Sequence, residues 1–205
     1  GKLVAELDQL KLREKTVLVF TGDNGNVGGG TLGGKPIDGG KGSMKEGGSR
    51  VPLLVNWKGT TPEGRLCKDL TDFSDFFPTF AELAGAKLPA GVTIDGHSFA
   101  PQVKGQPGKP REWVYVQLGA QRYVRDARWK LNQKGEFFDM AEAPFREIPV
   151  DLKTADAQAL DAHKRLQGAL QALVAQDKSG GTADVTPRKL RRAEKGKKAQ
   201  RKNRD

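Results

Sequence analysis

The sequence predicts an α/β fold in two parts, and three patterns along the chain support this prediction. Apolar residues recur at mostly helical spacing over residues 2–12, and a short β-branched and apolar run follows at residues 16–21. A helix followed by such a strand is typical of a sheet whose faces are covered. Between residues 113 and 139, four short strand-like runs separated by turns predict an antiparallel meander. Residues 154–176 then carry one apolar stripe at helical spacing.

The first part of the chain contains a long Gly-rich loop between two apolar runs. Residues 51–57 form the second run, which we expect to be a strand, and residues 22–50 form the loop. A loop of this length is uncommon inside a compact domain and is usually functional. Residues 71–85 place aromatic and aliphatic side chains on one side of a helix. Pro78 suits its first turn, so we expect the helix to begin near Asp75.

A linker with two prolines and two glycines at residues 105–110 separates the two parts. We therefore expect residues 1–104 to form a portion of an α/β core and residues 111–176 to form a small antiparallel sheet with a helix. Residues 177–205 are polar and rich in glycine and lysine, and we expect this tail to be disordered.

The net charge of +10 is located mainly in the tail. Residues 187–205 contain ten basic and two acidic residues, a net charge of +8, which leaves +2 for the rest of the chain. The predicted folded part therefore gives no reason to expect specific nucleic-acid binding. We expect a solvated tail, with weak polyanion binding as the alternative. No run of 18 apolar residues is present, so no membrane span is predicted.

Two candidate metal ligands, Asp23 and Asn24, follow the first predicted strand and are bounded by glycines. In open α/β sheets, ligands bind beyond the carboxyl ends of the strands. A carboxylate and an amide oxygen side by side are hard donors that suit Ca²⁺ or Mg²⁺. From these residues alone, a type I′ turn is the alternative, because Asp-Gly and Asn-Gly favour it.

Lys41 and Arg50 are candidates for binding an oxyanion in the Gly-rich loop. Three glycines flank Lys41, so its ammonium group can reach into a site while the backbone packs close to an anion. Arg50 ends the loop where the next strand begins, and its guanidinium group can form bidentate hydrogen bonds. The alternative is a solvated, flexible loop.

The sequence resembles the sulfatase family from about residue 3 to about residue 175. No single motif is decisive, but their colinear order and spacing are specific. The matching segments are residues 21–25, 40–42, 48–52, 72–79, 84–85, 95–99, 110–113, 128–131 and 138–139. The resemblance implies the C-terminal part of an alkaline-phosphatase-like core sheet, followed by a small four-stranded antiparallel sheet and a C-terminal helix.

The resemblance also implies an activity and a site. It implies an arylsulfatase-like sulfuric ester hydrolase that acts on aryl or carbohydrate sulfate esters with a divalent cation, Ca²⁺ or else Mg²⁺. In the family an Asp-Asn pair binds the cation, which assigns metal binding to Asp23 and Asn24. The lysine of the Gly-Lys-Gly motif contacts the substrate sulfate, which assigns a catalytic and substrate-binding role to Lys41. Substrate binding by Arg50 is predicted from the loop pattern alone.

The sequence departs from the family at the nucleophile, a formylglycine made from Cys or Ser in a C/S-x-P-x-R motif, which does not occur here. Cys67 has the wrong neighbours for this role, and we expect it to be a small, partly buried side chain. Neither His97 nor His163 matches a family catalytic histidine. His163 lies on the apolar stripe of the predicted helix, so we expect it to be packed in the core, and His97 lies in a predicted turn, so we expect it at the surface.

These departures lead us to expect the C-terminal half of a sulfatase, inactive alone, with formylglycine in the N-terminal half. The resemblance implies a periplasmic or secreted location. Two alternatives stay open. One is a non-catalytic, polyanion-binding protein with a sulfatase-like fold. The other is a phosphodiesterase or phosphatase of the same superfold, because a fold does not fix a function.

Overall fold

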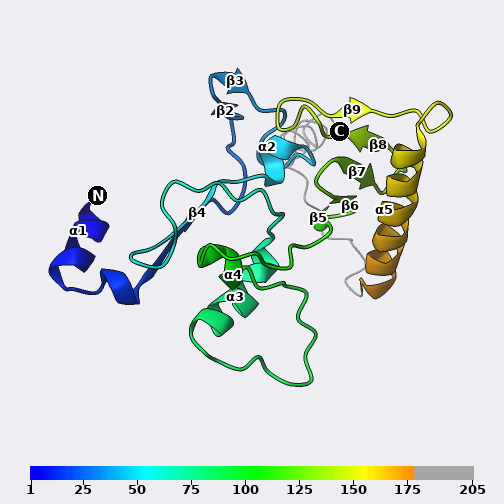
Figure 1. The fold of residues 1–205 in the computed structure, drawn as a ribbon. Helices are drawn as coiled ribbons and strands as arrows, with labels where there is room; N and C mark the ends of the chain where they lie inside the picture. The colour runs from blue at the N-terminus through cyan, green and yellow to red at the C-terminus, as the bar shows by residue number, and fades with distance from the viewer. Residues whose placement is uncertain (178–205) are drawn as a thin grey trace, which may run out of the picture.

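The computed structural model describes residues 1–177, which contain two main sheets joined by loops and short helices (Figure 1). The first sheet has two strands, because β1 (Val17–Thr21) pairs antiparallel with β4 (Leu53–Trp57). Two helical segments, α1 (Lys2–Gln9) and the 3₁₀ helix η1 (Arg13–Lys15), precede β1. They lie at the end of the molecule far from the second sheet (Figure 1).

The strand predicted at residues 16–21 is present, but the prediction that its faces are covered is wrong for the described residues. No residue of β1 is buried, and Phe20 keeps 67% of its surface exposed. Phe20 pairs in register with Leu54, which is 58% exposed, so one apolar face of this sheet is open to solvent. An apolar run predicts a strand, but it does not specify which residues cover that strand.

The Gly-rich loop between β1 and β4 contains a small hairpin and a helical turn. The hairpin consists of β2 (Thr31–Leu32) and β3 (Lys35–Pro36), joined by Gly33 and Gly34. Both glycines have positive φ angles, 57° and 79°, as a two-residue hairpin turn of this kind requires. The helical turn is α2 (Glu46–Ser49), which lies close to the second sheet (Figure 1).

The predicted phenylalanine-rich helix is present as the 3₁₀ helix η2 (Phe73–Asp75) followed by α3 (Phe76–Leu83). Asp72 and Asp75 form a capping box in which each carboxylate accepts a backbone hydrogen bond, so the free amide groups at the helix start are satisfied. Pro78 is the third residue of α3 and lies in its first turn, as predicted.

A buried ion pair connects this helical segment to the chain that leads into the second sheet. The Nη2 atom of Arg111 lies 2.5 Å from Oδ1 of Asp75, and both side chains are almost fully buried. The helix α4 (Ala100–Val103), which lies between these two residues in the sequence, packs against α3. The domain limits proposed from the sequence, residues 1–104 and 111–176, stay predictions.

The second sheet is antiparallel and has five strands rather than the four that the sequence predicted. Its strands in chain order are β5 (Val114–Leu118), β6 (Gln121–Arg125), β7 (Trp129–Asn132), β8 (Phe137–Asp139) and β9 (Ile148–Pro149). The first four correspond to the predicted meander. β9 pairs with β8 through only two residues, which is too short for an alternating pattern to reveal.

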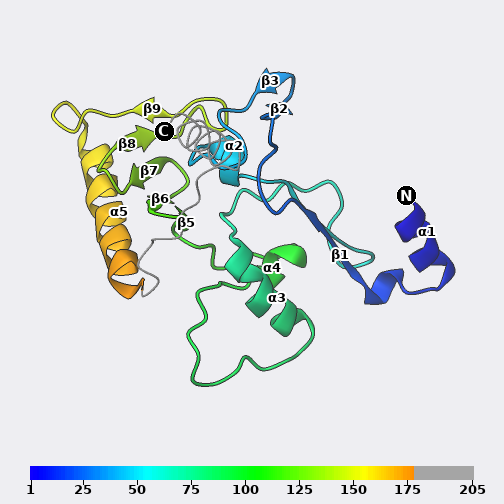
Figure 2. The same ribbon diagram turned by 180° about the vertical axis from the view of Figure 1, so that it is seen from behind.

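The helix predicted at residues 154–176 is α5 (Ala157–Gln176), and it covers one face of the second sheet (Figure 2). Asp156 caps it by accepting a hydrogen bond from the backbone nitrogen of Ala159 at 2.7 Å. The core between α5 and the sheet is formed by Val124, Trp129, Leu131, Phe137, Ala159, Ala162, Leu166 and Leu170. Within residues 1–177, no helix has the length and apolar character needed to cross a bilayer.

Candidate active site

Asp23 and Asn24 lie directly after β1, and their backbone geometry excludes the hairpin-turn alternative. A type I′ turn requires positive φ angles at both central residues, and neither Asp23, Asn24 nor Gly25 has one. Asp23 is exposed, and within the described residues its carboxylate forms no hydrogen bond or ion pair. The Nδ2 atom of Asn24 donates to the carbonyl oxygen of Gly25 at 3.1 Å. Both side chains therefore present oxygen atoms at the strand end.

The Gly-rich loop returns to this strand end through close backbone contacts. The backbone nitrogen of Gly25 donates to the carbonyl oxygen of Gly48 at 3.0 Å. A Cβ atom at Gly25 would lie 1.7 Å from the carbonyl oxygen of Gly47, so only glycine permits this approach. The backbone nitrogen of Lys41 donates to the carbonyl oxygen of Asn26 at 2.9 Å. These bonds bring the Asp23–Asn24 end of β1 and the Lys41 segment together.

Lys41 lies at the tip of a tight turn, and its side chain is exposed. The backbone nitrogen of Ser43 donates to the carbonyl oxygen of Gly40 at 2.9 Å, which closes the turn. The same segment lines a shallow surface pocket of about 620 Å³ that is largely open to solvent and is bordered by residues 27–31, 36–37 and 39–43. The ammonium group of Lys41 has no partner among the described residues, so it is available to an anionic ligand.

Arg50 differs from Lys41, because the structure gives it an internal partner. Its Nη1 atom lies 3.2 Å from Oε2 of Glu46, whose side chain is almost fully buried. The Arg50 side chain is still 53% exposed, so the pair lies at the edge of the loop. Its assignment to substrate binding stays a prediction, whereas its contact with α2 is a feature of the structure.

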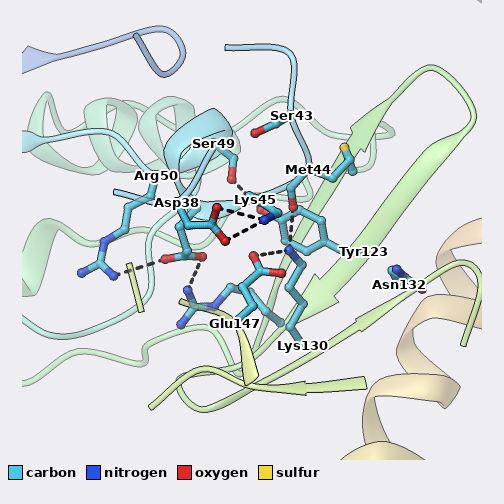
Figure 3. Close-up of polar contacts among 12 residues, drawn as sticks. Asp38, Ser43, Met44, Lys45, Ser49, Arg50, Tyr123, Lys130, Asn132 and Glu147 are labelled. Carbon is cyan, nitrogen blue, oxygen red and sulfur yellow. Dashed lines mark hydrogen bonds and ion pairs between the residues drawn. The ribbon is translucent and has the colours of Figure 1, made fainter. Parts of the chain in front are cut away.

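A buried polar network, which was not predicted from the sequence, connects the loop to the second sheet (Figure 3). Its members are Glu46, Tyr123, Arg125, Lys130 and Glu147, which are buried or partly buried. Burial raises the pKa of the Tyr123 hydroxyl to about 12. Polar residues alternate with core residues along β6 and β7, but such a pattern is also typical of a solvated sheet face.

The two histidines and the cysteine, which were considered for catalysis from the sequence, lie outside this region. His97 is exposed, as predicted, and His163 is half-buried with its ring 5.2 Å from that of Phe137. Cys67 is exposed, so the prediction of a partly buried thiol is wrong. Residues 1–177 contain no group of three or more His, Cys, Asp or Glu side chains that could hold a metal ion. Asp23 and Asn24 suit a divalent cation in chemical type, but they are two ligands of an incomplete set.

Comparison with known families places most of these candidates inside one matched region. The sulfatase family model matches residues 1–86. Mouse steryl-sulfatase is 38% identical over 138 residues, which cover 63% of this chain and 22% of that protein. Human arylsulfatase A is 37% identical over 119 residues, which cover 56% of this chain and 23% of that protein. This chain is a relative of the sulfatases.

Solved structures support the fold of this sulfatase relative. A sulfatase from a Pseudoalteromonas species superposes with a TM-score of 0.64 at 24% identity, covering 91% of this chain and 42% of that chain. A putative sulfatase from Bacteroides thetaiotaomicron superposes with a TM-score of 0.61 at 22% identity, covering 85% of this chain and 40% of that chain. The predicted fold class, an alkaline-phosphatase-like α/β part with a small antiparallel sheet and a C-terminal helix, is confirmed. The chain matches about a quarter of the length of its curated relatives.

Proposed function

We propose that this chain supplies part of the active site of an arylsulfatase-like sulfuric ester hydrolase. The observation that carries this proposal is the hydrogen bond from the backbone nitrogen of Lys41 to the carbonyl oxygen of Asn26 at 2.9 Å. It holds an unpaired lysine beside the strand end that carries Asp23 and Asn24. Residues 1–86, which match the sulfatase model, include all of these residues.

In this proposal the residues have distinct roles. Lys41 binds the sulfate oxygens and stabilises the negative charge that develops on them as the ester bond breaks. Asp23 and Asn24 provide oxygen ligands for Ca²⁺ or Mg²⁺, which when bound polarises the sulfate. Arg50 binds substrate at the edge of the loop. The formylglycine nucleophile comes from elsewhere in the protein, since this sequence contains no C/S-x-P-x-R motif. The remaining metal ligands also come from residues other than those described, which hold no group of three or more metal-ligating side chains.

The proposed substrates are aryl or carbohydrate sulfate esters. One structural relative, at 22% identity and a TM-score of 0.62, was solved in complex with its substrate D-glucosamine-2-N,6-O-disulfate. This supports sulfated sugars as a class to test for the present protein. We further propose a periplasmic or secreted location, because the family usually works there, and we propose that the 205-residue chain is inactive alone.

A second candidate function rests on the charge of the tail. The net charge of +8 over residues 187–205 favours an electrostatic interaction with acidic polysaccharides or nucleic acids. This tail lies outside the described residues. Such binding would weaken steeply as salt concentration rises, and it would disappear when residues 187–205 are removed.

The deciding experiment measures hydrolysis of an aryl sulfate with added Ca²⁺, using the protein as its gene encodes it. We expect Lys41→Ala to lower kcat/KM by about 100-fold or more, because removal of one charge-stabilising donor typically has this effect. Lys35→Ala is the matched control, because Lys35 is an exposed lysine of the neighbouring hairpin. We expect no hydrolysis by the 205-residue chain alone.

Two outcomes would contradict the proposal. If Lys41→Ala hydrolyses the aryl sulfate as fast as the unmodified protein, the assignment of Lys41 is wrong. If the protein prefers the matching aryl phosphate, a phosphatase or phosphodiesterase function replaces the sulfatase function.

A further inference from the structure

We propose that the polar face of the second sheet positions the loop that carries Lys41, with Lys130, Arg125 and Tyr123 as positioning residues. This inference rests on the proposed function, because it concerns the placement of the lysine that contacts the sulfate. It goes beyond that function, because the three residues lie outside residues 1–86 that match the family model.

The arrangement begins with the two faces of β6 and β7. Successive residues of a strand point to opposite faces. Val124 and Leu131 are register partners and point into the core under α5. Arg125 and Lys130 are also register partners, and they point to the opposite face. The loop that contains α2 lies on this opposite side, so the sheet separates the apolar core from a polar contact surface (Figure 1).

Lys130 holds the loop just after Lys41. Its Nζ atom donates to the carbonyl oxygen of Met44 at 2.5 Å and to Oε1 of Glu147 at 2.7 Å. The ammonium group also lies 4.2 Å from the centre of the Tyr123 ring. Figure 3 shows the Lys130 side chain extending from the sheet between Glu147 and Met44. A lysine that is only 3% exposed needs all of these partners, because a buried charge without them is very costly.

Arg125 and Tyr123 hold α2, the next part of the same loop. The Nη1 atom of Arg125 donates to Oε1 of Glu46 at 2.6 Å, and the Glu46 side chain is 3% exposed. The hydroxyl groups of Tyr123 and Ser49 lie 2.5 Å apart and share a hydrogen bond. Breaking either contact would leave a buried polar group unpaired, so the sheet fixes α2 in one arrangement.

These contacts limit where Lys41 can lie. The sheet holds the loop at Met44, Glu46 and Ser49, and Asn26 holds it at Lys41 itself. The loop is rich in glycine, so without these contacts its backbone would sample many conformations. A displacement of about 1 Å at a catalytic group can cost about 100-fold in rate. The contacts of the second sheet therefore act on catalysis through Lys41, without touching the substrate.

The test is a double-mutant cycle in the protein as its gene encodes it, with an aryl sulfate as substrate. We expect Lys130→Met to lower kcat/KM by about 10-fold to 100-fold. In a Lys41→Ala background, we expect the same substitution to cause little further loss, because the group that it positions is already absent. Lys134→Met is the matched control, because Lys134 is exposed in the turn between β7 and β8.

A structural readout separates positioning from general destabilisation. Hydrogen exchange of the backbone amides of residues 39–48 should become faster in Lys130→Met, while the amides of α5 stay protected. If Lys130→Met does not fold, Tyr123→Phe replaces it in both measurements, because this substitution removes only the hydroxyl group that contacts Ser49.

Three results would overturn the inference. If Lys130→Met lowers kcat/KM equally in the unmodified protein and in the Lys41→Ala variant, Lys130 acts on the whole fold and not through Lys41. The role of Lys41 in binding the sulfate would not be affected by this result. Unchanged exchange in residues 39–48 would mean that the sheet does not hold the loop. If Lys41→Ala alone has no effect on kcat/KM, the proposed function fails first, and the inference fails with it.

Discussion

The two sheets of this protein differ in how they are covered. Within residues 1–177, every buried hydrophobic residue lies at Phe99 or later. The second sheet packs one face on α5 and directs the other toward the Gly-rich loop. The first sheet has a β1 strand without a buried residue, and the apolar side chains of Phe20 and Leu54 are open to solvent.

The candidate site and the main source of stability therefore lie in separate parts of the described chain. Asp23, Asn24 and Lys41 all belong to the first part, which contains little buried apolar surface. The core belongs to the second part, and the polar network around Glu46 and Lys130 connects the two. We therefore expect changes in the apolar core under the second sheet to affect the free energy of unfolding. Changes in the first part should affect activity or solubility, and changes in the polar network should affect activity through Lys41.

The largest expected effect comes from removing apolar contacts in the covered region. Leu166 in α5 is fully buried, and Leu166→Ala should lower the free energy of unfolding by about 3 kcal/mol through lost burial and a cavity. Leu54→Ala, the same substitution on the open face of β4, should change it by less than about 0.5 kcal/mol. Urea denaturation of the 205-residue chain followed by circular dichroism measures both. Similar losses in the two variants would show that both sheets are equally covered in solution.

The sequence predicted the second sheet better than the first, for a physical reason. The alternation of residues along β6 and β7 and the stripe on α5 are local patterns, and their partners are close in the chain. Burial of β1 depends on residues that local patterns do not identify, so that prediction was wrong. The contact between Lys130 and Met44 joins residues 86 positions apart, and no local pattern reveals it. Asp23, Asn24 and Lys41 could be proposed because glycines mark sharp turns and close backbone approaches.

A smaller effect is expected from pH at the boundary between the two regions. Burial raises the pKa of Tyr123 from 10.0 to about 12. In the unfolded chain this hydroxyl group loses its proton near pH 10, whereas in the folded protein it keeps the proton up to about pH 12. Between these values the folded state binds more protons, so the free energy of unfolding falls as pH rises, by about 2–3 kcal/mol for a shift of this size.

Tyr123→Phe provides the control for this prediction, because phenylalanine has no proton to lose. Urea denaturation at several pH values between 9 and 12 measures the free energy of unfolding. As pH rises, this free energy should fall more steeply for the unmodified chain than for Tyr123→Phe. Parallel curves for the two proteins would mean that the Tyr123 hydroxyl is accessible to water, and that the loop does not close over the second sheet.

The smallest effect on stability is expected on the open face of the first sheet, where solubility should change instead. Phe20→Lys removes the most exposed side chain of β1, so the free energy of unfolding should change by less than about 0.5 kcal/mol. An exposed apolar sheet face promotes association, so the variant should aggregate more slowly and bind less of a hydrophobic dye. Light scattering and dye fluorescence measure these changes, with Leu88→Lys as a control in the loop between α3 and α4. If Phe20→Lys instead unfolds the chain, then Phe20 is covered in solution, and the contrast between the two sheets is smaller than the structure indicates.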